Sequence, residues 1–184
     1  MLKGKASVKM AGFGGQGVVL ASIILGRSAI LDGNYATQTA SYGSESRGGE
    51  CRAEVVISQA PIDYPLVDKV ETLVAMSQPS LSKYQADLIP GGLLIVDPDM
   101  VNKMPERNDI HITTVPAAKT ADALGRRIFE NMVMLGALQA KTRIISEESL
   151  IAAIRENVPP KTVDANLKAA SDGIRLASTS GIPA

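Results

Sequence analysis

The sequence predicts a three-layer α/β/α protein whose Rossmann-like sheet is mostly parallel but mixed, followed by C-terminal helices. Three observations predict this class. A glycine-rich turn near the start joins a short apolar run to a long helical pattern. Short apolar runs then alternate with helical segments as far as residue 115, and only helical patterns follow. We expect residues 1–184 to form one domain, which is long enough to bury a full core.

Apolar runs mark the expected strands, which are 7–11, 35–40, 52–58, 72–76, 93–96 and 110–115. The expected helices are 17–31, 79–87, 117–139 with a break near Gly125, 147–156 and 163–177. Gly33-Asn34 is typical of the cap that ends the first helix. Pro90-Gly91-Gly92 predicts a turn before the fifth strand. No convincing helix separates the third strand from the fourth, so we expect at least one antiparallel strand.

The glycine turn is the first candidate site. Its glycines satisfy the spacing G-x-G-x-x-G and add one more inside it. They permit a sharp turn and leave free N–H groups at the start of the following helix, where the helix dipole favours an anion such as a diphosphate. The candidate binding residues here are Gly12, Gly14, Gly15, Gln16 and Gly17.

A dinucleotide site also requires an acidic residue after the second strand, to bind the ribose hydroxyls. No Asp or Glu directly follows residues 35–40, and Asp32 precedes that strand. No Arg closes the strand to receive a 2′-phosphate, unless Arg47 folds back. These gaps argue against NAD or NADP, although an independent Rossmann-like nucleotide-binding protein remains the alternative interpretation.

Composition excludes several classes of protein. Nineteen basic residues balance nineteen acidic ones, so the net charge indicates neither nucleic acid nor a membrane surface as partner. No apolar stretch is long enough to span a bilayer and no signal peptide precedes the first strand, so we expect a cytoplasmic protein. Cys51 is the only cysteine, which excludes a cluster held by this chain's cysteines alone. We expect Cys51 to be structural, and His111 to be an outward-facing or satisfied strand residue.

Residues 41–51 lack any regular pattern and form the second candidate site, an irregular functional loop. Hydroxyls, carboxylates, one guanidinium and several glycines gather in it, and an arginine beside flexible backbone suits a phosphate or carboxylate. The simpler alternative is that internal ion pairs merely turn the chain. Its candidate residues are Ser44, Glu45, Arg47 and Gly48. Because both loops follow strands, we expect them to share the edge of the sheet where α/β proteins bind ligands.

Four segments together resemble the γ subunit of 2-oxoacid:ferredoxin oxidoreductases, over roughly residues 8–177. They are Gly12-Phe-Gly-Gly-Gln-Gly17 with the Val-Val-Leu-Ala-Ser that follows, Thr37-Gln-Thr-Ala-Ser-Tyr-Gly43 with Arg47-Gly-Gly49, Ile62-Asp-Tyr-Pro65, and Asn131-Met-Val-Met-Leu-Gly136. Ser44 departs from the family, which usually has proline after Tyr-Gly. This departure suggests a less rigid loop.

The resemblance implies an enzyme that oxidatively decarboxylates a 2-oxoacid with coenzyme A, producing acyl-CoA, CO₂ and reduced ferredoxin. It implies that α and β subunits hold thiamine diphosphate and magnesium, and that iron–sulfur clusters lie on other chains, including a ferredoxin-like δ subunit or ferredoxin. The loop sequence is more similar to 2-oxoglutarate enzymes than to pyruvate enzymes. This chain would then bind no cofactor or metal alone, contain no catalytic residue, be inactive when isolated, and self-associate through surfaces meant for partners.

For the two loops the resemblance leaves two roles open. They could shape the coenzyme A pocket at the active-site cleft, or they could only pack against partner subunits. In the C-terminal half, Asn131 lies in an apolar helix, so we expect its amide to hydrogen-bond a turn of its own domain. Gly136 in the same helix predicts close packing against a neighbour.

Overall fold

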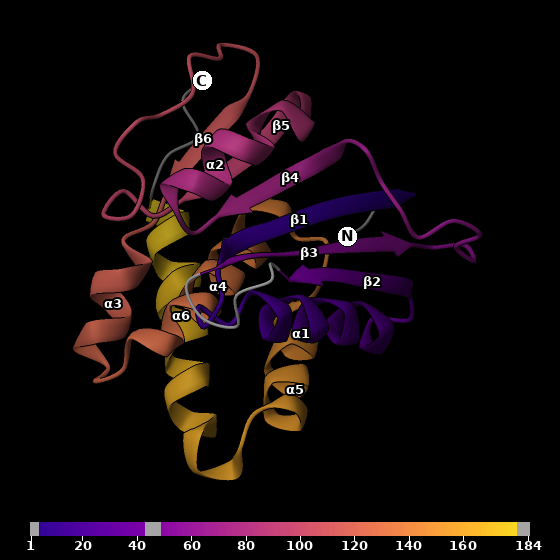
Figure 1. Cartoon of the computed structure of the whole chain (residues 1–184). Helices are drawn as coiled ribbons and strands as arrows, with labels where there is room; N and C mark the ends of the chain where they lie inside the picture. Colours follow the sequence, from indigo (N-terminus) through magenta and orange to yellow (C-terminus); the bar gives the residue numbers. More distant parts are fainter. Residues whose placement is uncertain (1–3, 43–48, 180–184) are drawn as a thin grey trace.

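The computed structural model describes residues 4–42 and 49–179, which form one six-stranded sheet in the order β2-β3-β1-β4-β5-β6 (Figure 1). The strands are β1 (Lys5–Phe13), β2 (Tyr35–Tyr42), β3 (Glu50–Ser58), β4 (Val70–Ala75), β5 (Leu88–Val96) and β6 (His111–Thr114). β3 runs antiparallel to both β1 and β2, whereas β1, β4, β5 and β6 are parallel. The sheet is therefore mostly parallel and mixed, as predicted.

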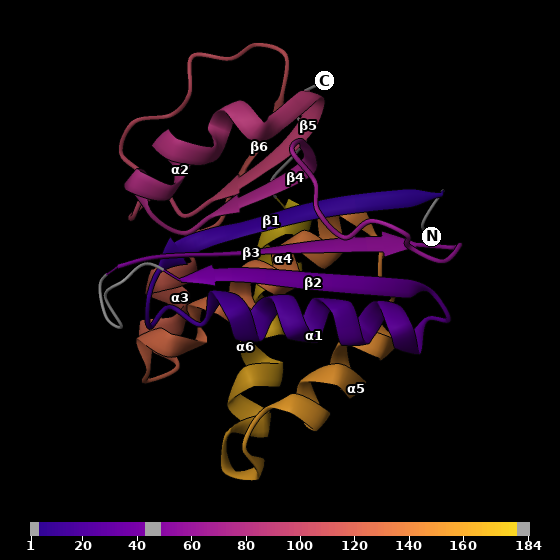
Figure 2. The ribbon, with the colours of Figure 1, turned by 45° about the vertical axis from the view of Figure 1, so that its right-hand side comes forward.

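Helices complete three layers. They are α1 (Val18–Leu31), α2 (Gln78–Tyr84), α3 (Ala117–Ala123), α4 (Glu130–Thr142), α5 (Glu147–Asn157) and α6 (Val163–Thr179), with short 3₁₀ turns at Gln85–Asp87, Arg127–Phe129 and Pro160–Thr162. Gly125 lies at the predicted break, in the turn between α3 and α4. α1 and α4 lie on one face of the sheet, α5 packs against α1 and α6 against α4, while α2 lies on the opposite face (Figures 1 and 2).

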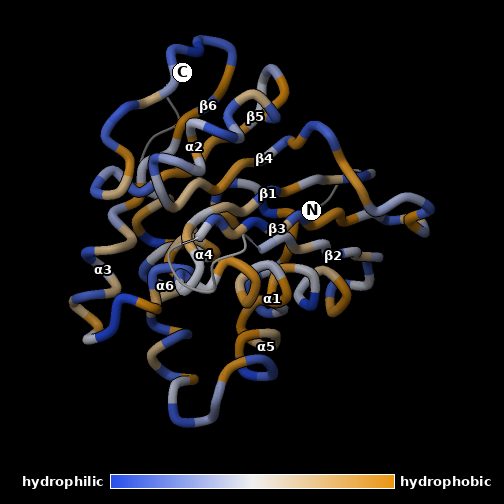
Figure 3. The backbone as a smooth tube through the Cα atoms, in the orientation of Figure 1, coloured by the Kyte–Doolittle hydropathy of each residue, from blue (hydrophilic) through white to orange (hydrophobic). Residues whose placement is uncertain are grey.

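Two hydrophobic clusters correspond to these two faces. The larger joins alternate residues of β1 and β3, such as Met10 and Val55, to the C-terminal helices. The smaller joins residues such as Leu73 and Leu94 to Leu81 and Tyr84 of α2 and its 3₁₀ end. Hydrophobic residues concentrate in the strands and along α1 and α4, whereas the connection between β5 and β6 is largely hydrophilic (Figure 3). The sheet is thus covered unequally on its two faces.

The closest helix contact joins α4 to α6. A Cβ placed on Gly136 would lie 2.0 Å from the carbonyl oxygen of Ala170, and one on Gly173 would lie 2.0 Å from that of Val133. Only glycine leaves room for this approach of two backbones. The prediction that Gly136 permits close packing is confirmed.

Two predictions about chain turns are corrected. Pro90-Gly91-Gly92 does not precede the fifth strand but lies within β5, where the pairing with β4 shifts between Val70 and Thr72. Gly91 takes a positive φ there. An irregularity inside a strand can require the same residue types as a turn, and for this reason the sequence predicts a turn. The second candidate loop is also shorter than 41–51, because residues 41–42 belong to β2 and residues 50–51 to β3.

None of the helices formed by the described residues combines the length and the apolar content needed to cross a membrane.

Candidate functional site

The candidate site lies between two neighbouring strands, β1 and β4, whose following connections pass over opposite faces of the sheet. From β1 the chain passes through α1 on one face of the sheet to β2, and from β4 it passes through α2 on the other face to β5. In open α/β sheets this arrangement leaves a crevice at the carboxyl ends of the two central strands, where ligands bind. The glycine turn follows β1 and therefore lies at the carboxyl ends of these central strands (Figure 2).

The Gln16 side chain bonds to the chain at the ends of both central strands. Its Oε1 accepts a hydrogen bond from the Phe13 N–H at 2.6 Å, and its Nε2 donates to the carbonyl oxygen of Met76 at 3.1 Å. These partners lie at the ends of β1 and just beyond β4, so the amide joins the two strands across the crevice. Gln16 is one of the predicted binding residues; its side chain bonds to partners within the chain, and its contact with a cofactor stays a prediction.

Gly17 closes the turn against α4. It precedes α1 in a left-handed conformation, with φ 75°, and no side chain caps the helix. Asn131 Nδ2 donates to the Gly17 carbonyl oxygen at 3.1 Å, and a Cβ on Gly17 would lie 2.3 Å from that nitrogen. The predicted hydrogen bond from Asn131 to a turn of its own domain is confirmed. Asn131 Oδ1 is buried and has no hydrogen-bond partner among the described residues.

A buried carboxylate supports the turn from the same side. Glu130 is only 3% exposed, and its Oε2 pairs with Arg127 Nε at 3.1 Å. Burial raises the pKa of the Glu130 carboxyl, and hydrogen bonds from Gln16 and Arg127 oppose that rise. Gln16 thus joins β1, the residue after β4, and α4. Reasoning from the sequence missed Glu130, because no local pattern relates it to a turn more than a hundred residues earlier.

A second buried carboxylate ends β5. Asp97 Oδ2 accepts from the Ala118 N–H at 2.6 Å at the start of α3, and its Oδ1 accepts from the Asp99 N–H at 2.8 Å. Burial raises the pKa of the Asp97 carboxyl as well, and the hydrogen bonds from the backbone oppose that rise. Asp97 therefore fixes the start of α3, so its role in the described chain is structural.

The glycine turn and the described ends of the second candidate loop lie at one edge of the sheet, as predicted. The Gly14 N–H donates to the Gly49 carbonyl oxygen at 2.7 Å, directly beyond the last pair of the β1–β3 ladder. Gly15 is exposed, and a Cβ placed on it would have no atom within 4 Å. The candidate residues Ser44, Glu45, Arg47 and Gly48 lie outside the described residues. The glycine turn therefore provides an anchor for the end of that segment.

Cys51 and Asp32, which a nucleophilic or a ribose-binding site would require, have structural roles. Cys51 is 5% exposed in the main core, and burial raises the pKa of its thiol, so it is structural as predicted. His111 is exposed on β6. Asp32 accepts hydrogen bonds from Ser146 and Ser149 at the start of α5, so it is unavailable as a ribose ligand.

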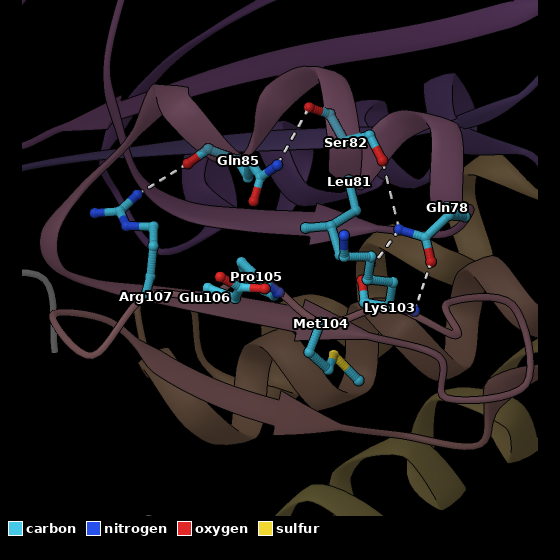
Figure 4. A pocket seen from close by; sticks show the side chains of 9 residues that line it. All are labelled: Gln78, Leu81, Ser82, Gln85, Lys103, Met104, Pro105, Glu106 and Arg107. Carbon is cyan, nitrogen blue, oxygen red and sulfur yellow. Dashed lines mark hydrogen bonds between the residues drawn. The ribbon is translucent and has the colours of Figure 1, made fainter.

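A separate pocket of about 420 Å³ lies between α2 and the segment leading to β6 (Figure 4). Gln78 Oε1 accepts from the Lys103 N–H at 2.8 Å. Arg107 pairs with both carboxylate oxygens of Asp109 and donates to the carbonyl oxygens of Gln85 and Leu88. These polar groups hold the segment against α2 instead of converging on the pocket.

Comparison with known proteins gives three findings. The family model described as pyruvate ferredoxin/flavodoxin oxidoreductase matches residues 7–176. The 2-oxoglutarate synthase subunit KorC of Methanothermobacter thermautotrophicus is 49% identical over 183 residues, covering 96% of this chain and 97% of the relative. The crystal structure of a keto/oxoacid ferredoxin oxidoreductase γ subunit from Geobacter sulfurreducens matches with TM-score 0.85 and 37% identity, covering 95% of this chain and 99% of that one.

The same fold occurs within a longer chain. A 2-oxoglutarate:ferredoxin oxidoreductase from Magnetococcus marinus, solved with 2-oxoglutarate, coenzyme A and succinyl-CoA bound, matches with TM-score 0.88 and 22% identity. The match covers 99% of this chain and 33% of that chain. This chain therefore has the fold of one part of that longer chain.

Proposed function

This chain belongs to the pyruvate ferredoxin/flavodoxin oxidoreductase family, and we propose that it is the γ subunit of a multi-subunit 2-oxoacid:ferredoxin oxidoreductase. The observation that carries the proposal is the 49% identity to a 2-oxoglutarate synthase subunit over nearly the full length of both chains. The match to a γ subunit of known structure over almost all of both chains supports the same role.

The reaction of the complete enzyme is the coenzyme A-dependent oxidative decarboxylation of 2-oxoglutarate. The acid loses CO₂, the remaining acyl group forms a thioester with coenzyme A, and the released electrons pass to ferredoxin. We assign 2-oxoglutarate because the relative that is 49% identical to this chain is named a 2-oxoglutarate synthase subunit. The test is a series of 2-oxoacids assayed with the complete complex. A preference for pyruvate over 2-oxoglutarate would contradict the assignment.

The cofactors of such an enzyme belong to other subunits. The donor set of this chain does not fit an iron–sulfur cluster, because its single cysteine, Cys51, is buried in the core. Among the described residues no group of three or more His, Cys, Asp or Glu side chains is placed to hold a metal ion. Thiamine diphosphate, magnesium and the clusters are therefore proposed to lie on α, β and a ferredoxin-like δ subunit or ferredoxin, with coenzyme A as co-substrate.

This chain contributes a surface to the assembly. We propose no phosphate site at the glycine turn, because the side chains of Gln16 and Asn131 bond to partners within the chain there. We assign it instead the role of anchor, because the bond from Gly14 to Gly49 fixes one end of the segment that contains Arg47. Arg47 is the residue we propose to contact a phosphate of coenzyme A, since guanidinium groups bind phosphate in a bidentate manner.

This role predicts a specific kinetic change. In the assembled enzyme, Arg47→Ala raises the KM for coenzyme A about tenfold or more, because one charge-assisted contact contributes roughly 1.5–3 kcal/mol. The KM for the 2-oxoacid stays unchanged. Arg155→Ala, which removes an exposed arginine from α5, is the matched control. An unchanged KM for coenzyme A in a normally assembled Arg47→Ala enzyme would leave the loops with a packing role only.

A further inference from the structure

β2 is an edge strand without the usual protection against pairing. Among the described strands it pairs with β3 alone, and this pairing is uninterrupted from Tyr35 opposite Ser58 to Tyr42 opposite Cys51. Its eight residues, Tyr-Ala-Thr-Gln-Thr-Ala-Ser-Tyr, include no charge and no proline. Exposed edges are normally shortened, charged or bulged, because their free N–H and C=O groups pair with other chains. The opposite edge, β6, has only four residues.

The sequence of β2 is complementary to itself. A strand presents its free backbone groups at every second residue, so two copies pair antiparallel only about an axis through one residue. An axis through Gln38 places like residues together. Thr37 then faces Thr39 of the second copy, and Ala36 faces Ala40. Cross-strand threonine pairs of this kind stabilise sheets.

The helix beside this edge is apolar on its outer side. Ile23 and Ile30 of α1 are 42% and 49% exposed. α1 lies over both β2 and β3, since the Cβ site of Gly26 is 3.9 Å from Ala36 Cβ and 4.0 Å from Val55 Cγ1. With strands about 4.8 Å apart, two copies of α1 would lie roughly 10 Å apart across the axis, which is a normal distance for packed helices.

The same surface has almost no charge to remove from water. α1 and β2 together contain one charged side chain, Arg27, which pairs with Glu156 of α5 at 2.6 Å. A helix that is apolar around most of its circumference is typical of a buried position. A helix face that stays in water is expected to carry polar and charged residues, whereas an interface explains the apolar outer face of α1.

We infer that the free edge of β2 and the outer face of α1 form a two-fold interface with a second copy of this chain. The two six-stranded sheets join across β2 into one continuous sheet, and the α1 helices pack against each other on one side of it. The same patch serves both copies, as two-fold symmetry requires. This inference is independent of the substrate and of the role of Arg47.

Cross-linking tests the register. Gln38→Cys places two thiols across the axis, so oxidation or a short bis-maleimide links two chains, both in the isolated protein and in the assembled enzyme. Ser41→Cys is the matched control on the same strand, because the strand rise of about 3.4 Å per residue separates its two copies by roughly 20 Å. The native Cys51 is buried, so the chain without added cysteines gives the background level of cross-linking. Cross-linking of residue 41 without residue 38, or of residue 38 to a different subunit, would overturn the inference.

A charge at the edge tests the interface itself. The native chain is expected to sediment as a dimer, and Ala40→Lys as a folded monomer at the same concentration. Ala40 is exposed and faces Ala36 of the second copy in this register. The control Ser178→Lys adds the same charge at an exposed position of α6 and leaves the dimer intact. A native chain that stays monomeric up to its solubility limit, or a dimer that Ala40→Lys does not affect, would contradict the proposal.

Discussion

Gly17→Ala tests most sharply whether the glycine turn is closed against α4. The change has two separate effects. Alanine at φ 75° is strained by about 1–2 kcal/mol. Its Cβ would also lie 2.3 Å from Asn131 Nδ2, and such overpacking adds about 1–3 kcal/mol. We therefore expect a loss of roughly 2–5 kcal/mol in the free energy of unfolding, measured by urea denaturation at one protein concentration.

Two further variants separate these effects. Gly15 also has a positive φ, but a Cβ there would contact nothing, so Gly15→Ala should show the strain alone. In an Asn131→Ala background the amide is gone, and the cost of Gly17→Ala should fall to about that of the strain. The reasoning is refuted if Gly17→Ala costs no more than Gly15→Ala, or if Asn131→Ala leaves its cost unchanged.

Three other predictions concern stability and reactivity. Gly136→Ala should lower the free energy of unfolding by about 3 kcal/mol, because the added Cβ meets a backbone oxygen of α6. The control Ser171→Ala, on the exposed side of α6, should change it by less than about 0.5 kcal/mol. Equal effects of the two substitutions would contradict the close packing of α4 and α6. Burial raises the pKa of Glu130 above its ordinary value of 4.5, so folding loses stability as pH rises from 4.5 through the raised pKa. Glu130→Gln should lack this loss. The free energy of unfolding of both proteins is measured by urea denaturation from about pH 4 to pH 8, and a difference that stays constant over this range would contradict the prediction. Cys51 should react with a thiol reagent only when urea unfolds the chain, and rapid labelling of the native protein would show that its burial is wrong.

The layers and most elements follow from local patterns in the sequence. The periodicity from Val18 onward predicts α1, and its end at Gly33-Asn34 is confirmed by hydrogen bonds from these two residues back to Ile30 and Ala29. The missing helix between the third and fourth strands predicts the antiparallel β3. Pro90-Gly91-Gly92 misled the prediction because positive φ and proline occur in strand irregularities as well as in turns.

The candidate site was only partly predictable, because its contacts join distant parts of the chain. The glycine spacing correctly locates the turn, and an amide in an apolar helix correctly indicates that Asn131 needs a partner. The sequence does not reveal that Gln16 contacts Met76 and Glu130, since only the fold brings these residues together. A pattern typical of phosphate binding therefore lies at a turn whose Gln16 side chain bonds to two other parts of the chain.

The most direct test of the account is an affinity purification of this chain from its native lysate, prepared without oxygen. The eluate is assayed for coenzyme A-dependent reduction of a viologen dye with each 2-oxoacid. The account predicts that larger chains copurify and that 2-oxoglutarate supports dye reduction. Recovery of the chain without partners or activity, but with a bound nucleotide, would contradict it.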